Sequence, residues 1–201
     1  MNALTLRRAA AWVLLVSCAC TVTQVPYGEE INDWRTAKDR FMREAADSPV
    51  LPGERAAFQP LVYFPVEEAY RIPAELRVIR GEDVMQMTTS DGKVREMRRI
   101  GTLAFTLKGQ AQTLTAFVES ATVDMRRLFV PFGDLTNGTE TYTGGRYLDL
   151  DRTATGIYDL DFNRAYFPFC YYNPAFICPI PPKENRLQVP VRAGERNGKK
   201  G

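Results

Sequence analysis

Alternation of apolar and polar residues runs through most of the chain after Leu61, and it limits the possible folds more than any other feature. A period of two places apolar side chains on one face of a strand, and turns containing glycine separate the runs. The runs cover residues 76–79, 84–87, 94–100, 103–107, 114–118, 128–132, 147–150, 157–162 and 187–191. About nine short strands predict a mainly β fold, either an antiparallel β-barrel or a strongly curved sheet.

Three segments are predicted to be β-hairpins. Ser90-Asp91-Gly92 and Lys108-Gly109-Gln110 supply two turns, the first being the stronger prediction because Asp-Gly suits positive φ angles. The third hairpin joins residues 147–151 to 157–161, and alternation points its carboxylates away from its apolar side chains. These carboxylates belong to Asp149, Asp151, Asp159 and Asp161. We expect water and the flanking Arg146, Arg152 and Arg164 to offset their repulsion, with a calcium ion as the alternative.

One helix is predicted ahead of the strands, over residues 29–47. Residues recur there at the three- and four-residue spacing of an amphipathic helix, at Ile31, Trp34, Lys38, Phe41 and Ala45. Acidic residues favour its N-terminal end, and Ser48-Pro49 ends it. We expect Trp34 and Phe41 to pack on the β domain and the helix to plug the barrel.

The first residues have the layout of a bacterial lipoprotein signal peptide, predicted over 1–17. Arg7-Arg8 precede the apolar run 9–16, and Ser17-Cys18 follows it. The prediction is an exported chain with an acylated Cys18, anchored by lipid to the bacterial membrane and facing the periplasm or cell exterior. The alternative is an ordinary cleaved signal peptide. A tether (18–28), a single domain (29–194) and a disordered basic tail (195–201) complete the predicted organisation.

Composition excludes several function classes. The chain contains no histidine, so Ser-His-Asp and Cys-His catalysis and histidine-dependent zinc sites are excluded. Removal of residues 1–17 leaves 24 of the 26 basic residues against 24 acidic ones. Because nucleic-acid-binding proteins normally carry a basic face, this balance predicts no nucleic-acid partner. No cofactor or metal is predicted.

Two of the four cysteines, Cys170 and Cys178, are separated by seven residues near the end of the domain. In an exported protein this pair is expected to form a disulfide, and Asn173-Pro174 supplies a turn between the two cysteines. A two-thiolate metal site is the alternative. Cys20 has no obvious partner.

Polar residues gather around Gly144-Gly145, which we interpret as a β-bulge or a place of close approach. Arg146 follows it, and a guanidinium there can bind a carboxylate of the fold or of a ligand. We predict that Arg146 contacts Glu140 or Asp161 in a partly open pocket, although a structural ion pair is the simpler interpretation. The residues expected to converge are Glu140, Tyr142, Arg146, Asp161 and Asn163.

Aromatic residues are dense around the cysteine pair. They are Phe162, Tyr166, Phe167, Phe169, Tyr171, Tyr172 and Phe176. Packing within the fold is the default interpretation. The functional alternative is a groove for a sugar ring, a peptide or a flat ligand. The predicted ligand-binding residues are Tyr142, Arg146, Asn163, Tyr166, Tyr172 and Asn185.

Three segments, 140–148, 160–163 and 178–185, resemble the signature segments of a widespread bacterial family, domain of unknown function 1684. The resemblance covers nearly all the chain after residue 34, and it implies one compact domain. It places Glu140, Arg146, Asp161, Asn163, Glu184 and Asn185 among the family's signatures. It implies no reaction, cofactor or partner. Tyr166-Phe167-Pro168 stands where the family is expected to have Tyr-Asn-Pro.

Two functions are compatible with the sequence. The first is a lipid-anchored envelope protein that binds a small ligand or an envelope protein without chemistry. The second is a hydrolase or transferase in which Glu140 and Asp161 act as acid and base, or Glu184 replaces one, with Arg146 orienting an anionic group. An enzyme requires these four residues to meet in a pocket. A binding protein leaves them scattered or sealed in the core.

Overall fold

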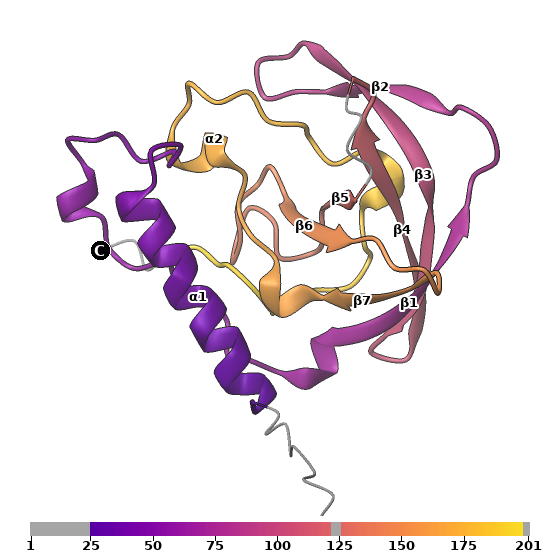
Figure 1. Cartoon of the computed structure of the whole chain (residues 1–201), viewed down its shortest axis with the longest axis horizontal. Helices are drawn as coiled ribbons and strands as arrows, with labels where there is room; N and C mark the ends of the chain where they lie inside the picture. The colour runs from indigo at the N-terminus through magenta and orange to yellow at the C-terminus, as the bar shows by residue number, and fades with distance from the viewer. Residues whose placement is uncertain (1–24, 122–125, 199–201) are drawn as a thin grey trace, which may run out of the picture.

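The computed structural model describes residues 25–121 and 126–198, and their fold is a strongly curved, nearly closed antiparallel barrel (Figure 1). Its strands are β1 (Arg71–Val78), β2 (Val84–Thr88), β3 (Val94–Leu107), β4 (Gln110–Glu119), β5 (Arg127–Phe132), β6 (Arg146–Asp151) and β7 (Ile157–Asp161). The sheet order is β6-β5-β4-β3-β1-β7, and β2 pairs with the first part of β3. The prediction of a mainly β antiparallel fold is confirmed.

Alternation decides what fills the barrel. Leu103, Leu114, Val130, Leu148 and Leu160 are nearly or fully buried and belong to one core cluster in the interior. The same cluster includes Leu150, Tyr158 and Phe162, so the predicted orientation of the apolar side chains on β6 and β7 is confirmed. Burial of these side chains is the main stabilising contribution to the domain.

In the described part of the chain, seven strands form where nine were predicted, for two reasons. Residues 94–107 are one long strand, because β3 bends at a bulge between Arg99 and Gly101 and continues. Residues 187–191 are irregular. Leu187, Val189 and Val191 are buried in alternation, but they bond to the loop after β5 and form no regular ladder.

The two predicted hairpin turns form with different geometries. At Lys108-Gly109 both residues have positive φ, 49° and 76°, as a two-residue primed turn requires. At Asp91-Gly92 only the glycine has positive φ, 79°, and the Gly92 amide donates to the carbonyl of Thr89. Both predicted hairpins therefore form, but the primed turn expected at Asp91-Gly92 is found only at Lys108-Gly109.

The third predicted hairpin does not form. β6 pairs with β5 and β7 pairs with β1, so β6 and β7 are the two ends of the sheet. They come together where the barrel almost closes, joined by the loop 152–156.

Helix α1 (Tyr27–Glu44) begins two residues before the predicted start and ends three before the predicted end. It lies against the outside of the barrel and does not plug it (Figure 1). Its ring contacts are Trp34 with Tyr63 and Phe41 with Phe169 on the short helix α2 (Phe169–Tyr172). The predicted packing of Trp34 and Phe41 on the domain is therefore observed.

Four short 3-10 helices complete the fold: η1 (Arg55–Ala57), η2 (Glu68–Tyr70), η3 (Phe162–Arg164) and η4 (Lys183–Asn185). The predicted tail begins too early, because Glu195 is 1% exposed and its amide donates to the carbonyl of Ala165 at 2.8 Å. The signal peptide, Cys18 and Cys20 lie outside the described residues. No helix within 25–121 and 126–198 has the length and apolar character needed to cross a membrane.

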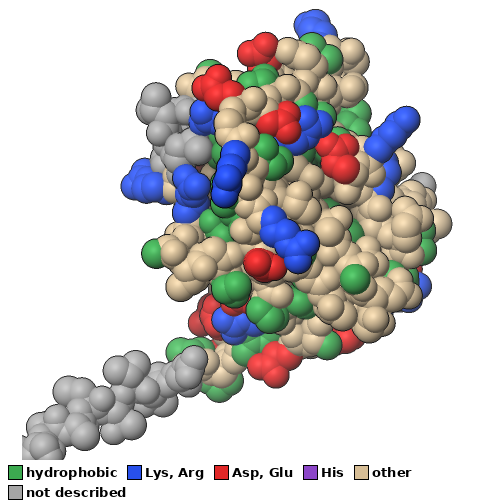
Figure 2. Space-filling model, turned by 90° about the vertical axis from the view of Figure 1, so that its right-hand side faces the viewer, with side chains coloured by type: hydrophobic (Ala, Val, Ile, Leu, Met, Phe, Trp, Pro, Cys, Tyr) green, Lys and Arg blue, Asp and Glu red, His purple; other side chains and the backbone are tan. Residues whose placement is uncertain are grey.

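Basic and acidic side chains are interspersed on the face over β1, β2 and β3 (Figure 2). Several are paired there, such as Arg99 with Asp83 at 2.8 Å and Arg77 with Glu75 at 3.4 Å. This face therefore offers no basic stripe to a polyanion.

Candidate functional site

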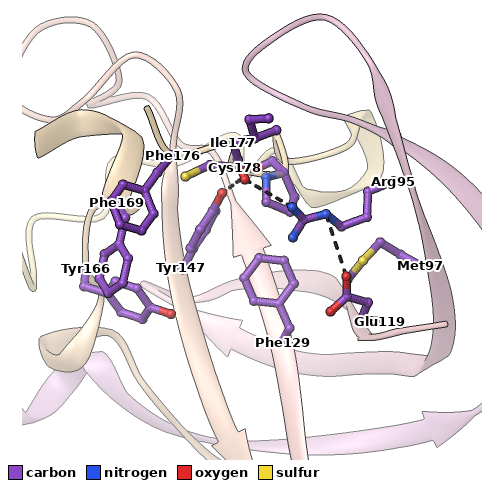
Figure 3. Close-up of a pocket in the computed structure, with 11 residues that line it drawn as sticks. Arg95, Met97, Glu119, Phe129, Tyr147, Tyr166, Phe169, Phe176, Ile177 and Cys178 are labelled. Carbon is purple, nitrogen blue, oxygen red and sulfur yellow. Dashed lines mark hydrogen bonds and ion pairs between the residues drawn. The ribbon is translucent and has the colours of Figure 1, made fainter. Parts of the chain in front are cut away.

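A pocket of about 340 Å³ lies on the outer face of the sheet (Figure 3). Residues of β3 to β6 form one wall, and the segment from Tyr166 to Pro179 forms the other. Five aromatic rings line it, those of Phe129, Tyr147, Tyr166, Phe169 and Phe176. The remaining lining residues are Arg95, Met97, Glu119, Ile177, Cys178 and Pro179. We call it the aromatic pocket.

The sheet wall exists because β3, β4 and β5 carry apolar residues on both faces. Met87, Met97 and Phe117 form a second buried cluster, and Phe129 packs against it. A strand with one solvated face would carry polar residues at these positions. The segment from Tyr166 to Pro179 covers this face, and the gap between the two is the aromatic pocket.

The rings of the aromatic pocket hold one another in place. Tyr147 stands edge-on to Phe129 at 4.7 Å and to Tyr166 at 5.8 Å between ring centres. Phe169 and Phe176 meet edge-to-face at 5.4 Å. Such edge-to-face pairs favour a fixed arrangement, so the walls are formed before any ligand arrives.

The polar groups of the aromatic pocket are uncharged, except at its rim. Burial raises the pKa of the Tyr147 and Tyr166 phenols well above the ordinary value, so both remain hydrogen-bond donors at neutral pH. Tyr147 donates to the carbonyl of Pro179 and Tyr166 donates to Asp149 at 2.8 Å.

The rim carries one ion pair. Arg95 lies 3.8 Å from Glu119 and donates to the carbonyl of Ile177 at 3.2 Å. Figure 3 shows this pair opposite Tyr166 and Phe169, across the opening. The arginine is half-buried, so its guanidinium can meet an anionic group at the mouth of the aromatic pocket.

The cysteine pair lies beside the aromatic pocket. Cys170 and Cys178 are free thiols in the structure, and the Cys170 amide donates to Sγ of Cys178 at 3.1 Å. Burial, with a hydrogen bond to Cys170, raises the pKa of the Cys178 thiol to about 12. A protonated thiol is a poor nucleophile. The disulfide stays a prediction.

Arg146 contacts neither Glu140 nor Asp161, so the predicted constellation is wrong. Its side chain is fully buried, and Nη2 donates to Asp134 Oδ2 at 2.8 Å and to the carbonyl of Val191 at 2.7 Å. Nη1 donates to the carbonyls of Ala193 and Glu195. The guanidinium therefore ties the C-terminal segment to the barrel and is sealed from any ligand.

The three candidate catalytic carboxylates lie in separate places. Glu140 accepts two hydrogen bonds from Arg192, each at 2.9 Å, on the surface. Glu184 pairs with Arg99 at 3.2 Å. Asp161 accepts from the Tyr27 phenol at 2.8 Å and from the Asn163 amide at 3.0 Å, so it caps η3.

Both candidate asparagines are fully buried and satisfied by backbone. The Asn163 side chain accepts from the Glu67 amide at 3.1 Å and donates to the Glu67 carbonyl at 2.9 Å. Asn185 accepts from the Thr115 amide at 2.7 Å and donates to the carbonyls of Thr115 and Pro131. It thus bridges β4 and β5 where their ladder is short.

The candidate tyrosines are divided among different hollows. Tyr166 lines the aromatic pocket, whereas Tyr142 lies on the other side of the cysteine pair in a hollow of about 290 Å³. Tyr172 is directed to Glu195, to which its hydroxyl donates. Only Tyr166 of the predicted ligand-binding residues lines the aromatic pocket.

The four aspartates predicted on a hairpin face instead line a cleft between β6 and β7. Arg71, Arg127 and Arg164 line the same cleft, and Arg71 lies 2.6 Å from Asp159. Within the described ranges, no three acidic or cysteine side chains lie close enough to hold one metal ion. Three arginines are in place to offset the repulsion between the aspartates, but of the flanking residues expected there, Arg146, Arg152 and Arg164, only Arg164 lines the cleft.

Comparison with known proteins places these sites in a family. The model of a family described as "Protein of unknown function (DUF1684)" matches residues 56–196. The chain belongs to this family. It is also similar to the solution NMR structure of an uncharacterized protein from gene locus rrnAC0354 of Haloarcula marismortui. The two are 39% identical, with a TM-score of 0.66, over 86% of this chain and 99% of that chain. The comparison with curated proteins gives no match.

The DUF1684 match contains all three segments on which the resemblance rests, and the family prediction is confirmed. It also contains every residue of the aromatic pocket. Helix α1 precedes the matched range, yet its Lys38 lies 3.4 Å from Glu195.

Sequence reasoning missed Asp134, Glu195 and the sheet wall of the aromatic pocket. Asp134 follows β5 after Gly133, and nothing local marks it as buried. Glu195 follows Ala193-Gly194, which belongs to the resemblance to DUF1684, but the predicted organisation places it in the tail. Phe129 and Met97 alternate with core residues, and their apolar character was the available indication of a second covered face.

Proposed function

We propose that this DUF1684 protein is a binding protein of the cell envelope, held to a membrane by lipid on Cys18. Its domain binds a small apolar ligand with a flat ring in the aromatic pocket, without chemistry. The observation that carries this proposal is a pocket of about 340 Å³ lined by five aromatic rings. Small-molecule sites are concave and mostly apolar, with a few polar groups that fix orientation.

The separation of the candidate catalytic residues supports binding rather than catalysis. Each of Glu140, Asp161 and Glu184 has its own partners, and Arg146 is sealed. Acid–base chemistry needs two such groups within reach of one substrate. In the aromatic pocket, Tyr147, Tyr166 and Cys178 all keep their protons, which does not favour a general base or a nucleophile there.

Arg95 at the rim favours flat ligands that carry a negative charge. A ring can stack among Phe129, Tyr147 and Phe169, while a carboxylate or sulfonate on that ring meets Arg95. Glu119 competes for the same guanidinium from 3.8 Å, a distance too long for a strong ion pair. We therefore expect aromatic anions to bind better than aromatic cations.

A fluorescent probe tests this proposal. Anilinonaphthalene sulfonate is an aromatic anion, and we expect one strong site for it per chain. Phe176→Ala removes a ring from the wall and should weaken binding about tenfold. Phe58→Ala is the matched control, because Phe58 is also a half-buried loop aromatic and lies outside the aromatic pocket. Fluorescence titration of the full chain in mild detergent measures both affinities.

Equal affinities in the Phe176→Ala and Phe58→Ala variants would contradict the proposed site. Circular dichroism and thermal melts of both variants verify that each is folded before titration. Loss of probe affinity in Arg95→Gln, with a smaller loss for an uncharged naphthalene probe, is the expected result if the rim guanidinium selects anions.

The anchor has its own prediction. Cys18→Ala should move the protein from the membrane fraction to the soluble fraction, because a lipid on Cys18 is the only membrane anchor that the sequence analysis predicts. Cys20→Ala is the matched control and should remain with membranes. Fractionation of cells expressing each form, followed by immunoblotting, measures this distribution. If the Cys18→Ala protein still pellets with membranes, another anchor or a membrane-bound partner holds it there.

A further inference from the structure

The barrel has an open seam between β6 and β7, which we call the seam cleft. Its two strands are the ends of the sheet order, and no ladder joins them in the described chain. One end of the seam is closed by Tyr147 and Tyr166, whose backbones exchange hydrogen bonds of 2.9 Å and 3.1 Å. The loop 152–156 joins β6 to β7 at the other end.

The free backbone groups of β6 can be assigned from its pairing. The Tyr147 amide and carbonyl bond to Tyr166 across the seam, and its partner on β5 is Pro131, which has no amide hydrogen. Backbone groups alternate in direction along a strand. Asp149 and Asp151 therefore direct their amides and carbonyls into the seam, whereas Arg152 donates to the opposite side, to the Arg126 carbonyl at 2.8 Å.

The same reasoning applies to β7. Asp159 stands opposite Pro73 of β1, so its amide and carbonyl point away from β1 and into the seam. The Gly156 carbonyl accepts from the Leu76 amide on the β1 side, which agrees with this alternation. At Ile157 the hydroxyls of Thr153 and Thr155 already donate to the carbonyl. The open stretch thus runs along Asp149 and Asp151 and faces Asp159.

The seam cleft has a volume of about 520 Å³ and is acidic. Five carboxylates line it against three arginines. The carboxylates belong to Glu30, Asp149, Asp151, Asp159 and Asp161, and the guanidiniums to Arg71, Arg127 and Arg164. Asp149 accepts a hydrogen bond from Tyr166 at 2.8 Å, and Asp151 pairs with Arg127 at 3.6 Å. Desolvation by the surrounding protein raises the pKa of the Asp149 carboxyl, although the residue is exposed within the cleft.

We infer that the seam cleft is a docking site for an extended peptide from a partner protein, with basic side chains at alternate positions, which adds as a strand to the free edge of β6. Strand addition uses main-chain hydrogen bonds for affinity and alternate side chains for specificity. Asp149 and Asp151 project from the same face two residues apart, so they meet every second side chain of an added strand. A basic residue opposite Asp149 gains an ion pair, and one opposite Asp151 competes with Arg127, which lies 3.6 Å from that carboxylate.

Charge argues against two other occupants, a second copy of this chain and the segment 18–28. A second copy of this chain would set Asp149 and Asp151 against the same carboxylates, and like charges on paired strands repel. The segment 18–28, which precedes and begins α1, contains no lysine or arginine. The test alters no residue that lines the aromatic pocket, but Asp149 accepts a hydrogen bond from Tyr166, which lines both sites.

A synthetic heptapeptide that alternates lysine with valine, labelled with fluorescein, is the probe. Anisotropy titration against the full chain in mild detergent should give saturable binding. A second peptide carries N-methyl groups at alternate residues, which remove the edge-facing amides but keep the charge. A third replaces lysine with glutamate. We expect about tenfold weaker binding of the N-methylated peptide and no saturable binding of the glutamate peptide.

Protein variants localise the site. The double variant Asp149→Asn/Asp151→Asn should weaken the lysine peptide about tenfold. The control Glu54→Gln/Glu82→Gln removes the same charge from exposed positions outside the seam cleft and should leave affinity unchanged. Hydrogen exchange should show that the peptide protects the amides of Asp149 and Asp151, which face the seam.

Three results would overturn the inference. Equal binding of the N-methylated peptide would mean that charge alone attracts the probe. Unchanged exchange of the Asp149 and Asp151 amides under saturating peptide would mean that no strand is added there. Concentration-dependent dimers that dissociate when Asp149 and Asp151 are replaced would assign the edge to a second copy instead and would equally reject the basic partner.

Discussion

Replacing Arg146 with methionine is expected to lower the free energy of unfolding by about 3 to 5 kcal/mol, the loss typical of breaking a buried ion pair. The guanidinium and the Asp134 carboxylate are both fully buried and 2.8 Å apart. Methionine fills much of the space but leaves Asp134 without its cation. It also removes the donors to the carbonyls of Val191, Ala193 and Glu195, which hold the C-terminal segment.

Arg192→Met is the matched control for this experiment. Arg192 lies on the same segment and makes two hydrogen bonds to Glu140, but this pair is exposed and should contribute at most about 1 kcal/mol. Urea unfolding followed by circular dichroism measures both losses. The double variant Arg146→Met/Asp134→Leu should recover part of the stability, because no unpaired charge remains. Equal losses for Arg146→Met and Arg192→Met would refute a structural role for this pair.

The fold class and the side-chain faces could be predicted because alternation is a local property. Leu148 and Leu150 are buried, and Asp149 and Asp151 are exposed, as a period of two requires. The partner of each strand is not a local property. Proximity in sequence favoured a hairpin of β6 with β7, but either strand could pair with any other that presents an apolar inner face.

Glycine explains one of the errors in strand number. In the sequence Gly101 resembles a break between two strands, but its lack of a side chain allows close packing within one bent strand. A Cβ at Gly101 would lie 2.6 Å from the carbonyl oxygen of Arg77 on β1. A glycine within an alternating run thus marks close approach as readily as it marks a turn.

The partner of Arg146 could not be identified from sequence proximity. Glu140 is nearer to Arg146 in sequence than Asp134 is, and Asp161 is farther, yet both are satisfied elsewhere, by Arg192 and by Tyr27. Asp134 is the partner because it follows β5, and β5 pairs with β6, the strand that Arg146 begins. This proximity depends on the order of strands in the sheet, which is a long-range property. The interpretation of Arg146 as a structural residue was correct in kind, and only the choice of carboxylate was wrong.

Only one wall of the aromatic pocket could be predicted from the sequence. Tyr166, Phe169 and Phe176 belong to the aromatic segment that sequence analysis singled out as a possible groove. The opposite wall comes from β3 to β6, where the pattern identifies Met97 and Phe129 only as strand residues. A pocket requires two surfaces, and the composition of one segment indicates only the first.

Gly145→Ala is expected to cost about 3 kcal/mol or more, from a strained backbone combined with a clash. Gly145 has a φ of 87°, and a Cβ there would lie 2.6 Å from Cγ of Pro181 and 2.7 Å from the carbonyl oxygen of Phe132. Neither neighbour is a flexible side-chain end, so β5 or the segment around Pro181 must move. Movement near Pro181 would also disturb Pro179, which lines the aromatic pocket.

Gly156→Ala separates the two causes. Gly156 has a φ of 73°, and a Cβ added there would meet no atom within 4 Å, so alanine encounters only the left-handed backbone cost of about 1 to 2 kcal/mol. Urea unfolding of both variants should therefore show the larger loss at Gly145, and Gly145→Ala alone should weaken anilinonaphthalene sulfonate binding. Equal losses at the two glycines would mean that Phe132 and Pro181 do not crowd Gly145, and the predicted link between this turn and the aromatic pocket would be rejected.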